Sequence, residues 1–414
     1  MTNRPPFLHP FARPSAGAEA FITMVRGEGA SVWDDLGNRY VDALASLWYC
    51  NVGHGRVEIA EAISKQAGAL AGFHCFDRFT NPPAEQLTAL LAESAPMAQA
   101  RVFLTCSGSE AVESALKLAR LAHFAAGHPQ RTLVISRTPS YHGVTYGAVS
   151  ATGLALNQAG FGPLLPDVVQ VGKDDLDALD EVLAERGHEL AAIISEPVIG
   201  AGGLYPPLPG YLATLRERCD RHGGFLILDE VICGFGRLGS MWGAQRYGVR
   251  PDMVTFAKGV TSGYQPVGGV LVGEAVRAPL EADPTLVLRH GHTYSGHPTA
   301  CAAAVANLAI LRAEGLLERA HHVGGRLSSG LRALVDGDGI VDVRGEGAMW
   351  AVELGEGRSA NDVREELLAR GVIARPLGNS AVAFCPPLVI NDADLDYCVE
   401  ATAAAVKAAP PSGG

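Results

Sequence analysis

The chain has 414 residues, of which 48% are hydrophobic and 19% charged, so its length suggests two or three domains and its composition excludes general disorder. The formal net charge of −11 argues against nucleic acid or an anionic membrane as the main partner, because both require a basic protein surface. The eight cysteines are scattered without a C-x-x-C pair, which indicates neither a disulfide framework nor a zinc site and favours a reducing cytoplasm.

The N-terminal 30 residues carry little pattern and are interrupted by proline, so we expect no signal peptide there. No apolar run approaches the ~18–20 residues that a membrane-spanning helix requires, and we therefore expect a soluble protein. Residues 30–46 contain two short alternating segments joined by an Asp-Leu-Gly-Asn turn, which predicts a β-hairpin.

Strand and helix patterns alternate between residues 55 and 310. Helical periodicity covers residues 109–126, 174–186 and 210–222. Short, nearly all-apolar strands between helices indicate a mainly parallel sheet with helices on both faces. The predicted strands are residues 100–105, 132–136, 167–171, 191–195, 224–229, 252–257 and 268–273.

A long helical stretch, residues 299–334, leads out of the predicted sheet into a mixture of short strands and helices. This change of pattern indicates a second, smaller α+β unit. We expect residues 1–54 to form an N-terminal arm and part of the small domain, and residues 55–310 to form the large domain. Residues 311–414 are expected to complete the small domain.

Two interpretations are open for residues 226–240, an apolar run followed by two acids and several glycines. Gly234-Phe-Gly236-Arg-Leu-Gly239 matches the G-x-G-x-x-G pattern of dinucleotide-binding loops. That pattern requires a helix directly after the glycines and an acid about 20 residues further on, and neither is found here. The glycines are therefore interpreted as loop formers, with a dehydrogenase-like or binding module as the alternative.

The second interpretation places the chemistry on Asp229. An ionised carboxylate at the buried end of a parallel strand needs a cation, and ligands bind at that edge of an open α/β sheet. Lys258 follows the predicted strand 252–257 and so lies at the same edge. A lone lysine there is usually a surface residue. Paired with a buried aspartate, it fits a Schiff-base lysine whose cofactor nitrogen is held by the carboxylate.

A third feature is the sequence Ser107-Gly108-Ser109-Glu110, which follows a predicted strand and opens a helix. It satisfies the S-x-x-E capping box, so a purely structural interpretation is available. Its free amides and the positive end of the helix dipole also favour a bound anion. An aldehyde-capturing lysine, a carboxylate for a pyridinium ring and a phosphate-binding helix together indicate pyridoxal 5'-phosphate.

Nine motifs in order, from about residue 30 to 400, resemble the class III (ω-type) aminotransferases, which are fold type I pyridoxal-phosphate enzymes. They are LWYCNVGHG, SGSEA, YHG, SEPV, LDEVICGFGR, FAKGV, HTYSGHP, RPLG and PPLVI. Each motif is weak alone, and their order and spacing carry the resemblance, which points to the amine–pyruvate branch. It implies an α/β fold with a large mainly parallel-sheet domain and a smaller α+β domain formed by the chain ends.

The resemblance also implies the residues that handle the cofactor. Lys258 would form the Schiff base and shuttle the proton, and Asp229 would keep the ring nitrogen protonated. Thr293 would reach the phosphate from a neighbouring subunit, which implies a homodimer with shared active sites. The implied cofactor-binding residues are Ser107, Gly108, Ser109, Tyr141, His142, Glu196, Asp229, Val231, Lys258 and Thr293, with Tyr141 and Val231 on opposite ring faces.

Substrate residues are implied in the same way. Trp48 and Phe76 resemble pocket-lining aromatics, and Arg375 resembles the mobile arginine that pairs with a keto-acid carboxylate. Asp77 departs from the family pattern, in which a neutral residue is expected. Its carboxylate either favours donors with a second cationic group or pairs with Arg78 on the surface.

The histidines 290, 292 and 297 lack a fourth ligand motif, so no metal is expected. We therefore expect a ping-pong transaminase that moves an amino group from a primary amine or ω-amino acid to a keto acid such as pyruvate. A pyridoxal-phosphate-dependent decarboxylase, mutase or racemase of the same fold is the alternative.

Overall fold

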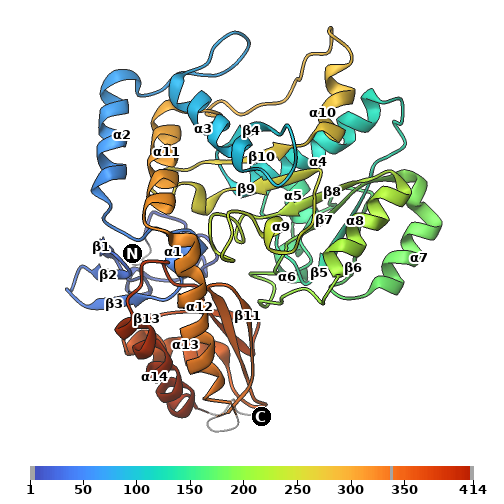
Figure 1. Cartoon of the computed structure of the whole chain (residues 1–414). Helices are drawn as coiled ribbons and strands as arrows, with labels where there is room; N and C mark the ends of the chain where they lie inside the picture. The colour runs from blue at the N-terminus through green and yellow to red at the C-terminus, as the bar shows by residue number, and fades with distance from the viewer. Residues whose placement is uncertain (1–4, 336–338, 411–414) are drawn as a thin grey trace.

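The computed structural model describes residues 5–335 and 339–410 of the chain. A seven-stranded sheet has the order β4-β10-β9-β8-β7-β5-β6, and β10 runs antiparallel to both of its neighbours (Figure 1). This large, mainly parallel sheet confirms the predicted α/β class and all seven predicted strands. The strands are β4 (Arg101–Thr105), β5 (Leu133–Thr138), β6 (Val168–Gly172), β7 (Leu190–Ser195), β8 (Phe225–Asp229), β9 (Met253–Phe256) and β10 (Gly268–Val272).

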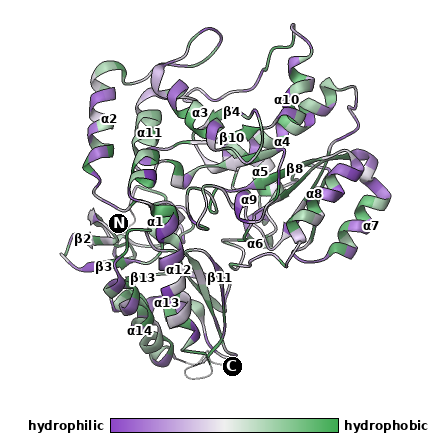
Figure 2. Cartoon of the chain, in the orientation of Figure 1, coloured by the Kyte–Doolittle hydropathy of each residue, from purple (hydrophilic) through white to green (hydrophobic). Residues whose placement is uncertain are grey.

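The two faces of this sheet are buried in separate cores, because successive side chains of a strand point to opposite faces. In β8, Phe225 and Ile227 belong to the core that α4 (Gly108–Ala125) covers. Leu226 and Leu228 belong to the core on the other face, with α8 (Tyr211–His222). Figure 2 shows β8 in hydrophobic colours between helices of mixed colour. A polar residue that ends such a strand is therefore held in a buried position.

Two smaller sheets lie beside the large one (Figure 1). The predicted hairpin is confirmed as β2 and β3, which pair antiparallel. Strand β13 pairs parallel with β3 and so joins the two ends of the chain in one sheet. The first small sheet contains β1 (Met24–Glu28), β2 (Ser31–Asp34), β3 (Arg39–Asp42) and β13 (Val372–Ile373); the second contains β11 (Ile340–Glu346), β12 (Met349–Leu354), β15 (Ala381–Phe384) and β14 (Arg375–Leu377).

The helical stretch expected over residues 299–334 is confirmed, but it is interrupted once. Two helices occupy it, α11 (Pro298–Ala313) and α12 (Leu316–Arg332), and they meet at an angle of 67°. Gly315 separates them with φ of +60°, a conformation that glycine adopts readily and that breaks a right-handed helix. In the described part of the chain, no single helix is long and apolar enough to cross a membrane, and only this bent pair meets those limits together.

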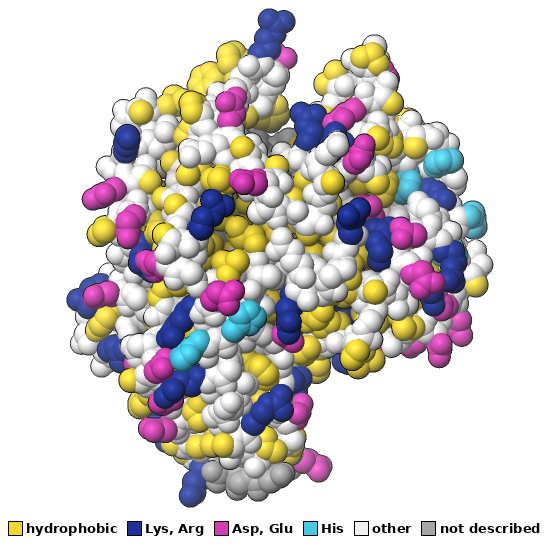
Figure 3. Space-filling view, in the orientation of Figure 1, with side chains coloured by type: hydrophobic (Ala, Val, Ile, Leu, Met, Phe, Trp, Pro, Cys, Tyr) yellow, Lys and Arg dark blue, Asp and Glu magenta, His cyan; other side chains and the backbone are white. Residues whose placement is uncertain are grey.

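The remaining helices lie around these sheets and at their edges (Figure 1). They are α1 (Ala45–Trp48), α2 (Val57–Leu70), α3 (Pro82–Ser94), α5 (Tyr146–Ala151), α6 (Ala155–Gln158), α7 (Leu176–Arg186), α9 (Gly243–Arg246), α10 (Glu274–Glu281), α13 (Ala360–Ala369) and α14 (Asp392–Ala408). Figure 3 shows acidic and basic side chains interspersed over the face in view. That face therefore presents no broad basic surface of the kind that binds nucleic acid.

Candidate active site

Asp229 ends β8 and is 4% exposed, at the edge of the sheet where the parallel strands finish. Its carboxylate is held by three donors. His142 Nδ1 lies 2.7 Å from Oδ2, and Oδ1 accepts hydrogen bonds from Thr255 Oγ1 at 3.0 Å and from the Val231 amide at 3.1 Å. These contacts fix the orientation of the carboxylate. A carboxylate oriented in this way can face a cationic ring nitrogen.

Lys258 begins a short 3₁₀ turn, Lys258–Val260, directly after β9. Burial lowers the pKa of its amine, while the negative charges of Asp229 and Glu196 act in the opposite direction and Arg375 adds to the lowering. A lysine whose pKa is depressed carries a larger fraction of neutral amine, and the neutral amine is the nucleophile. Its φ of +47° lies in the left-handed region, which non-glycine residues adopt uncommonly.

The N-terminus of α4 lies at the same cavity. Ser107 is the N-cap, and its Oγ accepts the Glu110 amide at 3.2 Å, while Glu110 Oε2 accepts the Cys106 amide at 2.8 Å. The first amides of a helix have no partner within the helix and point toward an anion. A Cβ on Gly108 would lie 2.9 Å from Val231 Cγ1, so the close approach of the two segments requires glycine.

Glu196 follows β7 and is buried. Its two oxygens accept the Tyr141 amide at 3.1 Å and the Gly200 amide at 2.8 Å. Burial raises the pKa of the carboxyl group, and the charge of Asp229 adds to that effect. Burial likewise raises the pKa of the Tyr141 phenol, which therefore stays protonated at neutral pH. Glu196 thus fixes the backbone at Tyr141, which lines the same cavity as Lys258.

One cavity brings together eight of the thirteen residues that the resemblance implies. Ser107 lies just behind it as the helix cap. Lining residues are Leu47, Gly108, Ser109, Tyr141, His142, Gly143, Glu196, Asp229, Val231, Ile232 and Lys258. An amine, a buried carboxylate and a helix N-terminus around one space fit pyridoxal phosphate, whose aldehyde, ring nitrogen and phosphate need those three groups.

The substrate residues are placed differently. Trp48 does not line this cavity but is 2% exposed in a core with Leu44, and Leu47 lines the cavity in its place. Positive φ angles at Ala45, Ser46 and Trp48 turn the chain in a way that sequence periodicity does not reveal. Arg375 begins β14; burial holds the pKa of its guanidinium below the usual range, and Tyr141 acts against that lowering. The two residues are therefore close enough to interact electrostatically.

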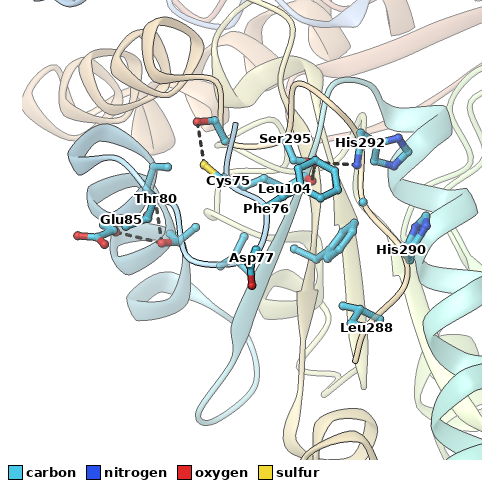
Figure 4. Close-up of a pocket in the computed structure, with 16 residues that line it drawn as sticks. Cys75, Phe76, Asp77, Thr80, Glu85, Leu104, Leu288, His290, His292 and Ser295 are labelled. Carbon is cyan, nitrogen blue, oxygen red and sulfur yellow. Dashed lines mark hydrogen bonds between the residues drawn. The ribbon is translucent and has the colours of Figure 1, made fainter. Parts of the chain in front are cut away.

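Phe76 and Thr293 lie away from this cavity in the single chain. Phe76 and Asp77 line a second cavity together with His290 and His292 (Figure 4). Thr293 is exposed in the turn that follows His292. Within the described residues Asp77 forms no ion pair, with Arg78 or any other group, and no cluster of His, Cys, Asp and Glu could hold a metal.

Sequence reasoning missed Thr255, Leu47, Ile232 and Gly143. Thr255 is the polar residue in the otherwise apolar strand before Lys258, and that exception could have identified it. The glycines 234–239 form a loop after β8, and the helix that follows, α9, begins only at Gly243. A dinucleotide loop needs its helix directly after the glycines, so that alternative is not supported.

Three comparisons bear on this site. The family model Aminotransferase class-III matches residues 13–406. A probable aminotransferase of Mycobacterium tuberculosis is 38% identical over 95% of this chain and 91% of its own length. The putrescine–pyruvate aminotransferase of Pseudomonas aeruginosa is 35% identical over 93% of this chain and 92% of its own. A crystal structure of an amine transaminase from an uncultivated Pseudomonas species, in its PLP-bound form, has a TM-score of 0.93 at 35% identity and covers 99% of this chain and 100% of that one.

Proposed function

Because this chain belongs to the class III aminotransferase family, we propose that it transfers an amino group from a primary amine or ω-amino acid to pyruvate. Amino-group transfer and pyridoxal phosphate as cofactor follow from the family and from its PLP-bound structural neighbour. The donor, the acceptor and the residue roles are our proposal. The observation that carries it is the meeting of Lys258, Asp229 and the N-terminus of α4 at one cavity.

When bound, pyridoxal phosphate supplies a carbonyl that condenses with amines and a ring that accepts electrons from the substrate carbon. Lys258 would hold the cofactor through its Nζ and would act as the general base that accepts a proton from the substrate carbon. Its pKa is lowered by burial, so Nζ is available in the neutral form for this task. Asp229 would hold a proton at the ring nitrogen, and His142 and Thr255 hold Asp229 in position.

The other residues bind and orient. The amides at Gly108 and Ser109 would hold the phosphate, with Ser107 capping the helix behind them. Tyr141 and Val231, which both line the cavity, would lie against opposite faces of the ring. Glu196 would lie beside the cofactor. Arg375 would pair with the keto-acid carboxylate, since a guanidinium presents two parallel donors to it.

We further propose a cytoplasmic homodimer in which Thr293 and Phe76 complete the site of the neighbouring subunit. Both residues are exposed in the single chain and neither lines its own cavity, which supports this assignment. Subunits carrying Lys258→Ala, mixed with subunits carrying Thr293→Ala, would form dimers with one intact site. Sedimentation measurements should give a dimer mass, and activity recovered on mixing should exceed the sum of the two variants. A monomer, or no recovery, would contradict shared sites.

The two half-reactions test the function directly. An amine donor added alone should convert the yellow holoenzyme to a colourless form, and pyruvate added alone should restore the yellow form. A panel should include a monoamine, a diamine of matched length and an ω-amino acid, because a relative is named for putrescine. Asp77→Asn then shows whether that carboxylate selects the diamine. Carbon dioxide release or racemisation without amino transfer would support a decarboxylase or racemase instead.

A further inference from the structure

The turn that carries Thr293 is anchored on one side by Ser295. Ser295 Oγ donates a hydrogen bond to the Leu104 carbonyl of β4 at 2.7 Å and accepts the His292 amide at 3.3 Å. The Ser295 amide donates to the His292 carbonyl at 2.9 Å. These contacts attach the turn 292–295 to β4, the edge strand of the large sheet, and leave Thr293 exposed.

On the other side, the same segment is joined to α4 by a line of polar side chains. Lys117 Nζ lies 3.0 Å from His290 Nδ1, and His290 Nε2 lies 2.9 Å from Ser114 Oγ. Ser114 Oγ lies 3.4 Å from His292 Nε2. His292 Nδ1 faces Glu110 Oε1 at 3.7 Å, an ion-pair separation rather than a hydrogen bond. Figure 4 shows both imidazoles turned toward the helix, away from Phe76 and Asp77.

Elementary donor and acceptor rules fix the proton on each ring. An ammonium group can only donate, so His290 Nδ1 accepts and His290 is neutral with its proton on Nε2. That proton goes to Ser114 Oγ, so the hydroxyl proton of Ser114 points to His292 Nε2. His292 then carries a proton on Nδ1, facing the Glu110 carboxylate. The line thus runs in one direction, from a cation to an anion, through Ser114, which is fully buried.

One of the residues that α4 contributes to this line of side chains also contacts the backbone just before the helix cap. Glu110, Ser114 and Lys117 are spaced by four and three residues, so they share one face of α4. The second oxygen of Glu110 accepts the Cys106 amide, one residue before the helix cap Ser107. A rigid helix therefore connects the turn at Thr293 with the proposed phosphate site at Gly108 and Ser109.

We propose that Lys117, His290, Ser114, His292 and Glu110 form a positioning network that holds the Thr293 turn in register with the N-terminus of α4 while His290 is neutral. The inference rests on the proposed role of Thr293 at the phosphate. None of the five residues touches the cofactor in this account, so they act only by position. Protonation of His290 replaces its acceptor nitrogen with a second donor, which faces the ammonium of Lys117 and breaks the line.

The charges around His290 set the direction of its pH dependence. Burial lowers its pKa, the positive charge of Lys117 lowers it further, and Glu113 of α4 acts in the opposite direction. His292 would add to the lowering only if its ring were itself protonated, and in the network it is neutral. The ring of Phe103, in β4, stacks on the His290 ring with 5.2 Å between the ring centroids, and it adds no charge. His290 is therefore neutral at pH 7, and the network is lost as the pH falls through this lowered pKa.

The test is the rate of cofactor release from the holoenzyme, followed by absorbance between pH 5 and 8. Wild-type release should accelerate at the acidic end. Ser114→Ala should release the cofactor roughly 2- to 10-fold faster at pH 7.5, the effect of one lost hydrogen bond. His290→Gln keeps a donor and an acceptor but does not titrate, so it should abolish the acidic acceleration. Lys117→Met should move the acceleration to higher pH, because the charge that lowers the pKa of His290 is gone.

Matched controls are His188→Gln and Lys65→Met, exposed residues far from this segment in sequence, which should behave as wild type. The ring protons of His290, titrated by NMR in wild type and Lys117→Met, report the network without reference to the cofactor. An ordinary His290 pKa of about 6.5 that Lys117→Met leaves unchanged would overturn the network. If His290 titrates as expected but Thr293→Ala leaves cofactor release unchanged, the proposed role of Thr293 fails instead.

Discussion

The buried carboxylate of Asp229 is held by neighbours of suitable hydrogen-bonding capacity. Asp229 is fixed by His142 and Thr255, and both of these side chains are buried. His142 Nε2 has no hydrogen-bond partner among the described residues, so the ring is oriented through Nδ1. Buried histidine and carboxylate groups are costly to leave unpaired, so His142 and Asp229 stabilise each other. The Asp229 carboxylate is thereby held in place for a contact with the cofactor nitrogen.

Asp229→Asn should leave the protein folded and slow the donor half-reaction by roughly 10²-fold or more, the range attributed to acid–base groups. A neutral amide cannot hold a positive charge on the ring nitrogen, so electrons from the substrate carbon are accepted less readily. Stopped-flow absorbance after mixing with a saturating amine measures this rate. Asp283→Asn, an exposed residue in a distant loop, is the control. Near-normal rates in Asp229→Asn would refute the role.

Arg375→Ala should weaken pyruvate far more than a simple uncharged amine. A hydrogen bond to a charged group contributes about 1.5–3 kcal/mol, or roughly 10- to 150-fold in apparent affinity. The guanidinium Nε has no hydrogen-bond partner in the part of the chain that the structure describes, so this donor is available. The concentration dependence of each half-reaction separates the two substrates. Equal losses for pyruvate and the amine would show that Arg375 serves the fold rather than the acceptor.

Among the elements, α4 links the cap, the proposed phosphate site and the turn at Thr293. Its first residues approach the loop after β8 so closely that the side chain of Val231 limits what can stand at Gly108. The helix is also buried along one side, with Ala111, Val112 and Ala115 in the core that covers the sheet. The position of its N-terminus is therefore set by packing, and the proposed anion site depends on that position.

Gly108→Ala should lower the affinity for pyridoxal phosphate while the protein stays folded. The new methyl carbon would lie 2.9 Å and 3.1 Å from the two Cγ atoms of Val231, which is too close without movement of the helix or the loop. Adding Val231→Ala should relieve the contact and restore part of the affinity. Gly68→Ala in α2 is a matched control, because nothing lies near its Cβ position. Cofactor titration measures the affinities, and an unaffected Gly108→Ala variant would contradict the close packing.

The strands and the site residues at their ends were predictable, because each is marked by a local pattern of residues in the sequence. An apolar run such as β8, ended by Asp229, is visible in the sequence, and the edge at which it ends follows from the parallel sheet. Gly315 was a visible helix breaker whose effect was not anticipated. The contact between His290 and Ser114 was not predictable, because it joins residues 176 positions apart through tertiary packing. The backbone turn that buries Trp48 was also hidden from periodicity.

At the scale of the whole molecule, the site lies where the large sheet meets the two ends of the chain. Buried Arg237, in the loop after β8, donates to the Pro386 carbonyl at 2.6 Å and to Asn51 Oδ1 at 2.5 Å. One side chain therefore ties this loop to segments near both chain ends. The domain limits at residues 54 and 310 stay a prediction, but the parallel pairing of β3 with β13 is consistent with a small unit formed from both ends.

Protonated Glu230 should add to the free energy of unfolding, and this contribution should be lost as the pH rises. Burial raises the pKa of this carboxyl to about 7, against the hydrogen bonds from the amides of Gly243 and Ala244. The folded state therefore binds a proton between pH 4.5 and 7 that the unfolded state has released. The stabilisation is complete below about pH 4.5 and disappears as the pH rises through 7. At about 1.4 kcal/mol per pKa unit, it amounts to about 3 kcal/mol.

Glu230→Gln cannot titrate at this position. The free energy of unfolding of this variant, measured as a function of pH, is therefore the reference for wild type. The free energy of unfolding of wild type minus that of Glu230→Gln should fall by this amount between pH 4.5 and 8. Chemical denaturation of both proteins in parallel gives the difference. Glu185→Gln, a surface residue of α7, controls for the loss of one charge. A flat difference across this range would show that Glu230 stays ionised in the fold.

Borohydride reduction of the holoenzyme shows which lysine binds the cofactor. Reduction should fix one cofactor per chain, seen as a single mass increase of the intact protein, and peptide mapping should place it on Lys258. Lys258→Ala should take up no reducible cofactor at this site and should lose almost all turnover. Label on any other lysine, or an active Lys258→Ala variant, would contradict the assignment of Lys258 as the residue that binds pyridoxal phosphate.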